Sequence, residues 1–193
     1  MANVKSVMIV GVGGQGSLLA SKLLGNVLLS RGFDVKVSEV HGMSQRGGSV
    51  VTYGRYGDKV YSPIVSEGEA DAVVSFERLE AARWLPYLKE GGRLIVNDQR
   101  IDPMPVITGA AQYPDGVLEK LAATGANLLA VDALSLAEQA GSAKAVNVVL
   151  MGVLSTLLDI PEEAWQASLE ACVPAKFLEL NRRAFALGRN HTA

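Results

Sequence analysis

The stretch VKSVMIVGVGGQG, residues 4–16, decides the fold that this sequence predicts. A short apolar run enters a cluster of glycines, and residues 17–30 follow with the composition of a helix. Strand, glycine turn and helix in this order open a βαβ unit. Gly11, Gly13 and Gly16 match the G-x-G-x-x-G pattern of dinucleotide-binding folds, in which the helix N-terminus faces a phosphate group.

A second polar stretch, HGMSQRGGS at residues 41–49, follows the next apolar segment of the chain. Arg46 carries a permanent planar charge, and the neighbouring glycines let the backbone turn its N–H groups toward a ligand. We therefore expect the turn and this loop to form one anion-binding site, for a phosphate or a carboxylate. Its candidate cofactor-binding residues are Gly11, Gly13, Gly14, Gln15 and Gly16 of the turn and His41, Ser44, Gln45, Arg46, Gly47 and Gly48 of the loop.

Other interpretations of these residues stay open at the level of sequence. The glycines also suit a tight strand-to-helix turn that binds nothing, and Arg46 suits a flexible surface loop in which it pairs with an acidic neighbour. His41 is compatible with a hydrogen-bonded loop histidine and with an acid–base group. Glu39 stands roughly where NAD-binding domains hold the ribose, so the alternative function is a stand-alone NAD(P)-binding oxidoreductase or a nucleotide-sensing module.

Composition limits the class of protein. The 193 residues are 49% hydrophobic and 20% charged, which favours one domain over residues 1–193 with a substantial core. A net charge of -2 and no run of Lys or Arg argue against nucleic acid as a partner. The longest nearly uncharged apolar stretch, residues 145–158, is shorter than the roughly 20 residues of a membrane span. We expect a cytoplasmic protein that does not enter a membrane.

The ionisable and aromatic side chains outside the two polar stretches point to structural roles. Cys172 is the only cysteine, so the chain cannot supply an internal disulfide or the ligands of an iron–sulfur cluster, and we expect no metal site. Cys172 itself is expected to be a small buried hydrophobe. Glu80 and Arg83 have the spacing of a surface ion pair on a helix, and Trp84 and Trp165 that of core or interface anchors.

The pattern of the whole chain predicts an α/β three-layer sandwich with a Rossmann-like, mostly parallel mixed sheet. A β-hairpin insertion is expected at residues 49–53 and 59–61, and residues 145–193 are expected to form a helical C-terminal part of the same domain. The other expected strands are residues 4–10, 34–40, 71–75, 93–97 and 128–131, and the expected helices are residues 17–30, 77–88, 117–123, 135–140, 146–158, from 161 onward, and 174–187.

With these motifs in place, the chain resembles the gamma-type subunits of 2-oxoacid:ferredoxin oxidoreductases, and among them the indolepyruvate type. The resemblance covers nearly the whole chain. Its most specific part is the block from Glu39 to Gly48; the glycine turn, residues 147–152 and residues 185–188 support it.

The resemblance implies a complex that oxidatively decarboxylates a 2-oxoacid, with aryl pyruvates as the first expectation. Such a complex uses thiamine diphosphate, iron–sulfur clusters and coenzyme A, forms an acyl-CoA and carbon dioxide, and reduces ferredoxin. This chain has one cysteine and no Gly-Asp-Gly thiamine signature, so we expect the thiamine diphosphate and the iron–sulfur clusters on a large alpha subunit and a chain that is inactive alone. The nearly uncharged first helix and the apolar C-terminal helices are expected to provide a protein interface, through which the isolated chain is able to form a homodimer.

Overall fold

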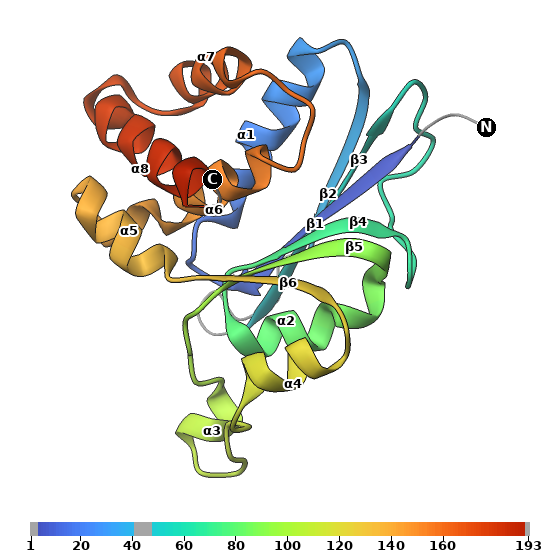
Figure 1. Cartoon of the computed structure of the whole chain (residues 1–193), viewed down its shortest axis with the longest axis vertical. Helices are drawn as coiled ribbons and strands as arrows, with labels where there is room; N and C mark the ends of the chain where they lie inside the picture. The colour runs from blue at the N-terminus through green and yellow to red at the C-terminus, as the bar shows by residue number, and fades with distance from the viewer. Residues whose placement is uncertain (1–3, 41–47, 192–193) are drawn as a thin grey trace.

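The structure, a computed structural model, describes residues 4–40 and 48–191, which form a mixed sheet with helices on both faces (Figure 1). The strands lie in the order β2-β3-β1-β4-β5-β6, and β1, β4, β5 and β6 run parallel while β3 is antiparallel to β1 and β2. The strands are β1 (Lys5–Val12), β2 (Asp34–Val40), β3 (Ser49–Gly57), β4 (Ala70–Ser75), β5 (Leu88–Asn97) and β6 (Asn127–Val131), and the helices are α1 (Ser17–Ser30), α2 (Arg78–Trp84), α3 (Met104–Ile107), α4 (Val117–Ala123), α5 (Ala133–Ala140), α6 (Val146–Ser155), α7 (Glu162–Cys172) and α8 (Leu178–Asn190). The predicted three-layer α/β sandwich is confirmed.

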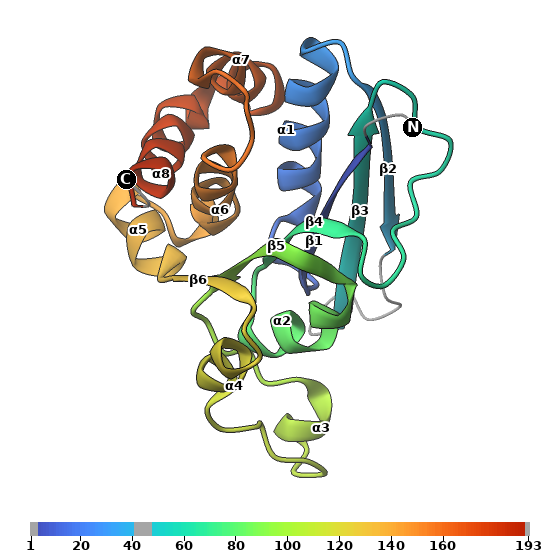
Figure 2. The same cartoon turned by 45° about the vertical axis from the view of Figure 1, so that its right-hand side comes forward.

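Two hydrophobic cores cover the two faces of the sheet. Val7 and Ile9 of β1 point to the face that α1 and α5–α8 cover, whereas Met8 and Val10 point to the face that α2 and α4 cover. All four side chains are at most 1% exposed, because alternate residues of a strand face opposite sides of a sheet and both sides are filled. Figure 2 shows α1 and the C-terminal helices on one side of the strands and α2, α4 and the short α3 on the other.

The hairpin predicted at residues 49–53 and 59–61 is wrong. Residues 49–57 form the single strand β3, which pairs along its length with β1 on one side and β2 on the other, so the antiparallel hairpin is the β2–β3 pair. Residues 59–61 are irregular. The Val60 amide donates to the Asp34 side chain at 2.8 Å instead of joining a strand ladder, and Tyr61 is 88% exposed.

The helix predicted over residues 77–88 is correct only in its first part. α2 ends at Trp84 and a 3₁₀ turn covers Leu85–Tyr87, because Pro86 has no N–H to continue the helix. The predicted break at Gly91 and Gly92 lies inside β5, where the pairing with β4 shifts register and Gly91 has a φ of 73°. The short helix α3 was not predicted.

The C-terminal helices are held together by two glycines. A Cβ on Gly152 of α6 would lie 2.1 Å from the Phe185 carbonyl oxygen, and a Cβ on Gly188 of α8 would lie 2.0 Å from that of Val149. The two helix backbones therefore touch without side chains between them. All ten residues of α6 are buried, so the apolar helix expected to meet a partner is instead buried within the chain.

The remaining sequence-based expectations for single side chains are partly correct. Trp165 is a core residue, 1% exposed, beside Phe185. Glu80 and Arg83 form the expected ion pair at 3.0 Å, but Glu80 is only 4% exposed, so the pair is half-buried and not a surface pair. Cys172 is partly exposed at the end of α7 and not fully buried as predicted.

Candidate functional site

The glycine turn between β1 and α1 is closed by the side chain of Gln15. The Gln15 Oε1 atom accepts from the Val12 amide at 2.9 Å, and its Nε2 atom donates to the Phe76 carbonyl at 2.8 Å. Phe76 directly follows β4, so one amide side chain ties the turn to the end of the neighbouring parallel strand. Gln15, expected from the sequence to bind a ligand, uses both of its side-chain groups within the protein.

Three glycines of the turn are required for different reasons. A Cβ on Gly11 would lie 2.9 Å from the Phe76 Cβ, so close packing requires glycine there. Gly16 has a φ of 82°, and its Cβ would lie 2.6 Å from the Asn147 Nδ2 atom of α6. Gly14 also has a left-handed backbone, with a φ of 96°, but nothing lies within 4 Å of its Cβ position. Gly14 is thus the glycine of the three that faces open space.

That open space is a hollow of about 490 Å³ at the carboxyl ends of β1, β5 and β6. The crossover from β1 through α1 and the crossover from β4 through α2 lie on opposite faces of the sheet, and ligands of open α/β folds bind at such a point. The lining residues are Gly14, Gln15, Gly16, Gln99, Ile101, Leu134, Ala143, Lys144 and Val146.

The charge at this hollow favours an anion. The amides of Ser17 and Leu18 begin α1 and precede the first intrahelical donor, which is Leu19, so they are free of the helix ladder. Lys144 reaches the hollow from the turn before α6 and has no ion-pair partner in the described part of the chain. An ammonium group and a helix N-terminus together suit a phosphate or a carboxylate.

The structure brings the turn and the end of the second polar stretch together. The Gly13 amide donates to the Gly48 carbonyl at 3.0 Å, and the Ser49 hydroxyl donates to the carboxylate of Glu80 on α2. Gly48 therefore lies against the glycine turn, as one shared site requires. His41, Ser44, Gln45, Arg46 and Gly47 lie outside the described residues.

Glu39 does not occupy the place of a ribose-binding acid. In dinucleotide-binding folds the second strand lies beside the first, but here β3 separates β2 from β1. The Glu39 carboxylate accepts a hydrogen bond from the Ser21 hydroxyl of α1. The arrangement argues against the NAD-binding alternative.

A buried polar cluster that the sequence did not reveal supports this edge of the sheet. Asn97 is fully buried; its Nδ2 atom donates to the Phe76 carbonyl at 3.1 Å and its Oδ1 atom accepts from the Ala133 amide at 3.2 Å. Glu77, 1% exposed, accepts from the Glu80 amide at 2.9 Å and from the Tyr113 hydroxyl. The signal available in the sequence was a polar residue at the end of one predicted strand, Asn97, and an acidic residue two positions after the end of another, Glu77.

Burial and the Glu77 carboxylate both raise the pKa of the Tyr113 hydroxyl. The desolvation of Tyr113, followed by its hydrogen bond to Glu77, raises the pKa of the tyrosine above its ordinary value.

Among residues 4–40 and 48–191, no three His, Cys, Asp or Glu side chains form a group that could hold a metal ion. In the same residues, no helix combines the length and apolar character that crossing a bilayer requires.

Comparison with known proteins identifies the family. A family model described as pyruvate ferredoxin/flavodoxin oxidoreductase matches residues 6–191. The chain belongs to this family. A relative from Thermococcus kodakarensis, named indolepyruvate oxidoreductase subunit IorB, is 45% identical over 188 residues, which cover 95% of this chain and 93% of the relative. The protein of the same name from Archaeoglobus fulgidus is 35% identical and covers 96% of this chain and 94% of the relative.

Solved structures share the fold. The gamma subunit of a keto/oxoacid ferredoxin oxidoreductase from Geobacter sulfurreducens aligns with a TM-score of 0.69 and 24% identity, covering 96% of each chain. The 2-oxoglutarate:ferredoxin oxidoreductase of Magnetococcus marinus aligns with a TM-score of 0.74 and 18% identity over 97% of this chain but only 30% of its own longer chain. The family expected from the sequence is confirmed by the family match and by the identity to these relatives.

Proposed function

We propose that this chain is the small, cluster-free subunit of an indolepyruvate-type 2-oxoacid:ferredoxin oxidoreductase. In that complex an aryl pyruvate is decarboxylated and oxidised to an acyl-CoA, with release of carbon dioxide and transfer of the electrons to ferredoxin. The observation that carries the proposal is the 45% identity to a protein named as an indolepyruvate oxidoreductase subunit, over 93% of that protein's length.

The cofactors divide between this chain and a larger partner according to the side chains available. One cysteine does not fit the cysteine ligand set of an iron–sulfur cluster, and the sequence holds no Gly-Asp-Gly signature for thiamine diphosphate. We therefore assign both groups to a large alpha subunit that completes the enzyme and passes electrons to ferredoxin. We also propose that residues 1–193 fold as one domain, that the chain is cytoplasmic, and that it forms a homodimer when the partner is missing.

Coenzyme A fits the residues at the glycine turn. Its phosphates require cationic and N–H donors, and the hollow offers Lys144 and the first amides of α1. We assign the phosphate site to these groups together with the turn residues Gly11, Gly13, Gly14, Gln15 and Gly16, Gly48, and the loop residues His41, Ser44, Gln45, Arg46 and Gly47. Gln15 acts there by holding the turn, since its side chain is engaged with Val12 and Phe76.

The test is co-expression of this chain with its large partner, followed by assays of 2-oxoacid-dependent and CoA-dependent ferredoxin reduction. We expect indolepyruvate and phenylpyruvate to be used at least about tenfold more efficiently than pyruvate or 2-oxoglutarate. A preference for pyruvate or 2-oxoglutarate would contradict the substrate class, and full activity of the large subunit alone would contradict the role of this chain.

The coenzyme A contact has its own test in the same complex. We expect Lys144→Ala and Arg46→Ala each to raise the KM for coenzyme A about tenfold, the effect of losing one charged hydrogen bond, without changing the KM for the 2-oxoacid. Lys120→Ala is the matched control, because Lys120 is exposed on α4 and does not line the hollow. An unchanged KM for coenzyme A in both variants would remove the contact from the proposal.

A further inference from the structure

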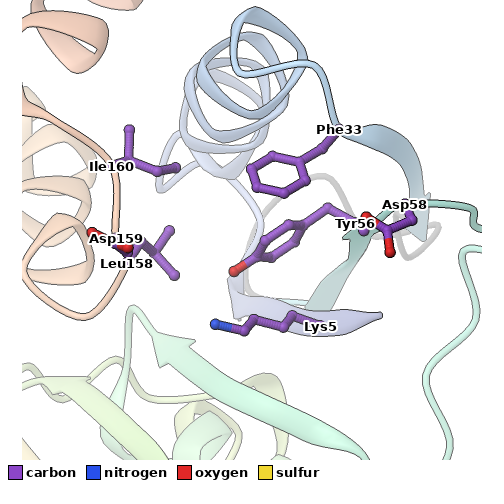
Figure 3. A pocket seen from close by; sticks show the side chains of 8 residues that line it. Lys5, Phe33, Tyr56, Asp58, Leu158, Asp159 and Ile160 are labelled. Atoms are coloured by element: carbon purple, nitrogen blue, oxygen red, sulfur yellow. The ribbon is translucent and has the colours of Figure 1, made fainter. Parts of the chain in front are cut away.

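A second hollow, of about 260 Å³, lies at the opposite end of the strands from the glycine turn, where β1 begins and β3 ends. One wall is aromatic, with Phe33 and Tyr56 packed edge to face at a centroid distance of 5.4 Å. The segment between α6 and α7 provides the opposite wall through Leu158 and Ile160. Figure 3 shows these four apolar side chains facing the same space from the two sides.

The hydroxyl of Tyr56 is the unusual group in this hollow. Tyr56 is only 6% exposed, and Figure 3 shows its hydroxyl pointing into the hollow toward Leu158. Within residues 4–40 and 48–191, no hydrogen bond is made by this hydroxyl. Because this oxygen opens into the hollow and has no partner among those residues, its donor and acceptor positions are available to a ligand there.

The charges around the hydroxyl define the sign of that ligand. The Lys5 ammonium ends on the same side of the hollow as the Tyr56 hydroxyl (Figure 3), and within the described residues Lys5 has no ion pair. Desolvation, with a smaller contribution from Asp71, raises the pKa of Tyr56 to about 12, so the phenol stays a donor at neutral pH. Two donors, one of them cationic, suit an acceptor with a single negative charge, and the carboxylates of Asp58 and Asp159, which also line the hollow, disfavour a second negative charge on the ligand.

We propose that this hollow binds a small monocarboxylate with an aromatic or aliphatic body, whose carboxylate contacts the Tyr56 hydroxyl and the Lys5 ammonium. The body packs between Phe33 and Tyr56 on one side and Leu158 and Ile160 on the other. The volume of about 260 Å³ suits a molecule the size of an amino acid or an aryl acetate. The proposal does not depend on the coenzyme A contact at the opposite end of the strands.

The experiment is calorimetric titration of the full chain, alone and in the assembled complex, with phenylacetate and with its neutral analogue phenylacetamide. We expect phenylacetate to bind with a Kd of about 1 mM or below, and the amide to bind at least about tenfold more weakly. Tyr56→Phe, which keeps the ring, and Lys5→Gln should each raise the Kd for phenylacetate about tenfold. Tyr61→Phe and Lys120→Gln are the matched controls, since both side chains are exposed and outside the hollow, and they should leave the Kd unchanged.

Four results would overturn the proposal. The first is the absence of saturable binding of phenylacetate up to about 10 mM, and the second is equal binding of acid and amide, which would remove the carboxylate contact. The third is binding that survives both Tyr56→Phe and Lys5→Gln, which would put the ligand elsewhere. Binding to the isolated chain that disappears in the complex would also contradict it, because the hollow would then be covered by the partner subunit.

Discussion

Two glycines of the turn, Gly14 and Gly16, share a left-handed backbone but have different surroundings. An alanine at either position carries the strain of a positive φ, which costs about 1–2 kcal/mol. At Gly16 the new methyl group would also meet Asn147, at 2.6 Å. We therefore expect Gly14→Ala to lower the free energy of unfolding by about 1 kcal/mol and Gly16→Ala by about 3 kcal/mol, as measured by urea denaturation of the isolated chain.

The contact with Asn147 gives this prediction an internal check. If the methyl group at position 16 acts through Asn147, the double variant Gly16→Ala, Asn147→Ala will lose less stability than the sum of the two single variants. Strict additivity, or equal losses at Gly14 and Gly16, would mean that backbone strain alone explains both glycines.

Tyr56 links the stability of the chain to pH. Its pKa is 10.0 when exposed and is raised to about 12 in the fold, so the folded state keeps a proton that the unfolded state releases between these values. The stabilisation is complete below pH 10 and is lost as the pH rises toward 12. We expect the free energy of unfolding to fall above pH 10 by up to about 1.4 kcal/mol per pH unit more in the wild type than in Tyr56→Phe. If the free energy of unfolding changed equally with pH in the two proteins, the raised pKa of Tyr56 would be contradicted.

Some of these residue roles follow from the sequence and others do not. The glycine turn is recognisable because few residue types tolerate such a backbone, and Gly13 and Gly48 do meet as one shared site requires. Asn147 is 131 residues from Gly16 along the chain, and no local pattern indicates their hydrogen bond. The use of Gln15 within the turn is equally hidden, since an amide side chain suits a ligand and a backbone alike.

At the scale of elements, the contact between α6 and α8 depends on the absence of two side chains. A methyl group on Gly152 or Gly188 would overlap a backbone carbonyl of the other helix, and a backbone atom cannot rotate away as a side chain can. We expect Gly152→Ala and Gly188→Ala each to lower the free energy of unfolding by about 3 kcal/mol or more.

Gly25 supplies the control for these two variants. It lies in the interior of α1 with nothing within 4 Å of its Cβ position, so alanine there brings only its better helix propensity. Gly25→Ala should raise the free energy of unfolding by about 0.5–1 kcal/mol. Thermal or urea unfolding of the three variants side by side tests the expected gain in stability at Gly25 and the expected losses at Gly152 and Gly188. Stabilisation by an alanine in α6 or α8 would refute the close contact.

The elements that the sequence predicted well are those whose burial is set locally. β1 and β4 contain short uninterrupted apolar runs, and α1 is a nearly uncharged segment between a glycine turn and Gly32. The ends of all three form within about two residues of the predicted limits. β3 was misjudged because the choice of hairpin partner is a long-range matter: residues 49–57 pair with both β1 and β2, and the nearby residues 59–61 take no part. Residues 41–47, which make up most of the specific block from Glu39 to Gly48, lie outside the part of the chain that the structure describes.

At the scale of the whole molecule, the sheet has a buried centre and two open edges. β1 and β4 are covered on both faces, whereas β2 and β6, the outermost strands, have mostly half-buried or exposed residues. We expect amide hydrogen exchange in β1 and β4 to require global unfolding and that in β2 and β6 to be faster by at least about tenfold. Mass spectrometry of the isolated chain measures this, and uniform protection across the sheet would contradict it.

The strand order also bears on how the chain folds as it leaves the ribosome. β1 is synthesised first and becomes a central strand, and β4, β5 and β6 then join on one side in the order in which they are made. Both strands of the β2–β3 hairpin, whose pairing is local, are synthesised before β4, and the hairpin pairs with β1 on the side opposite to β4. No strand has to be inserted between two that have already paired. The sheet is therefore able to grow outward from β1, with each new strand pairing at an edge of the strands made before it.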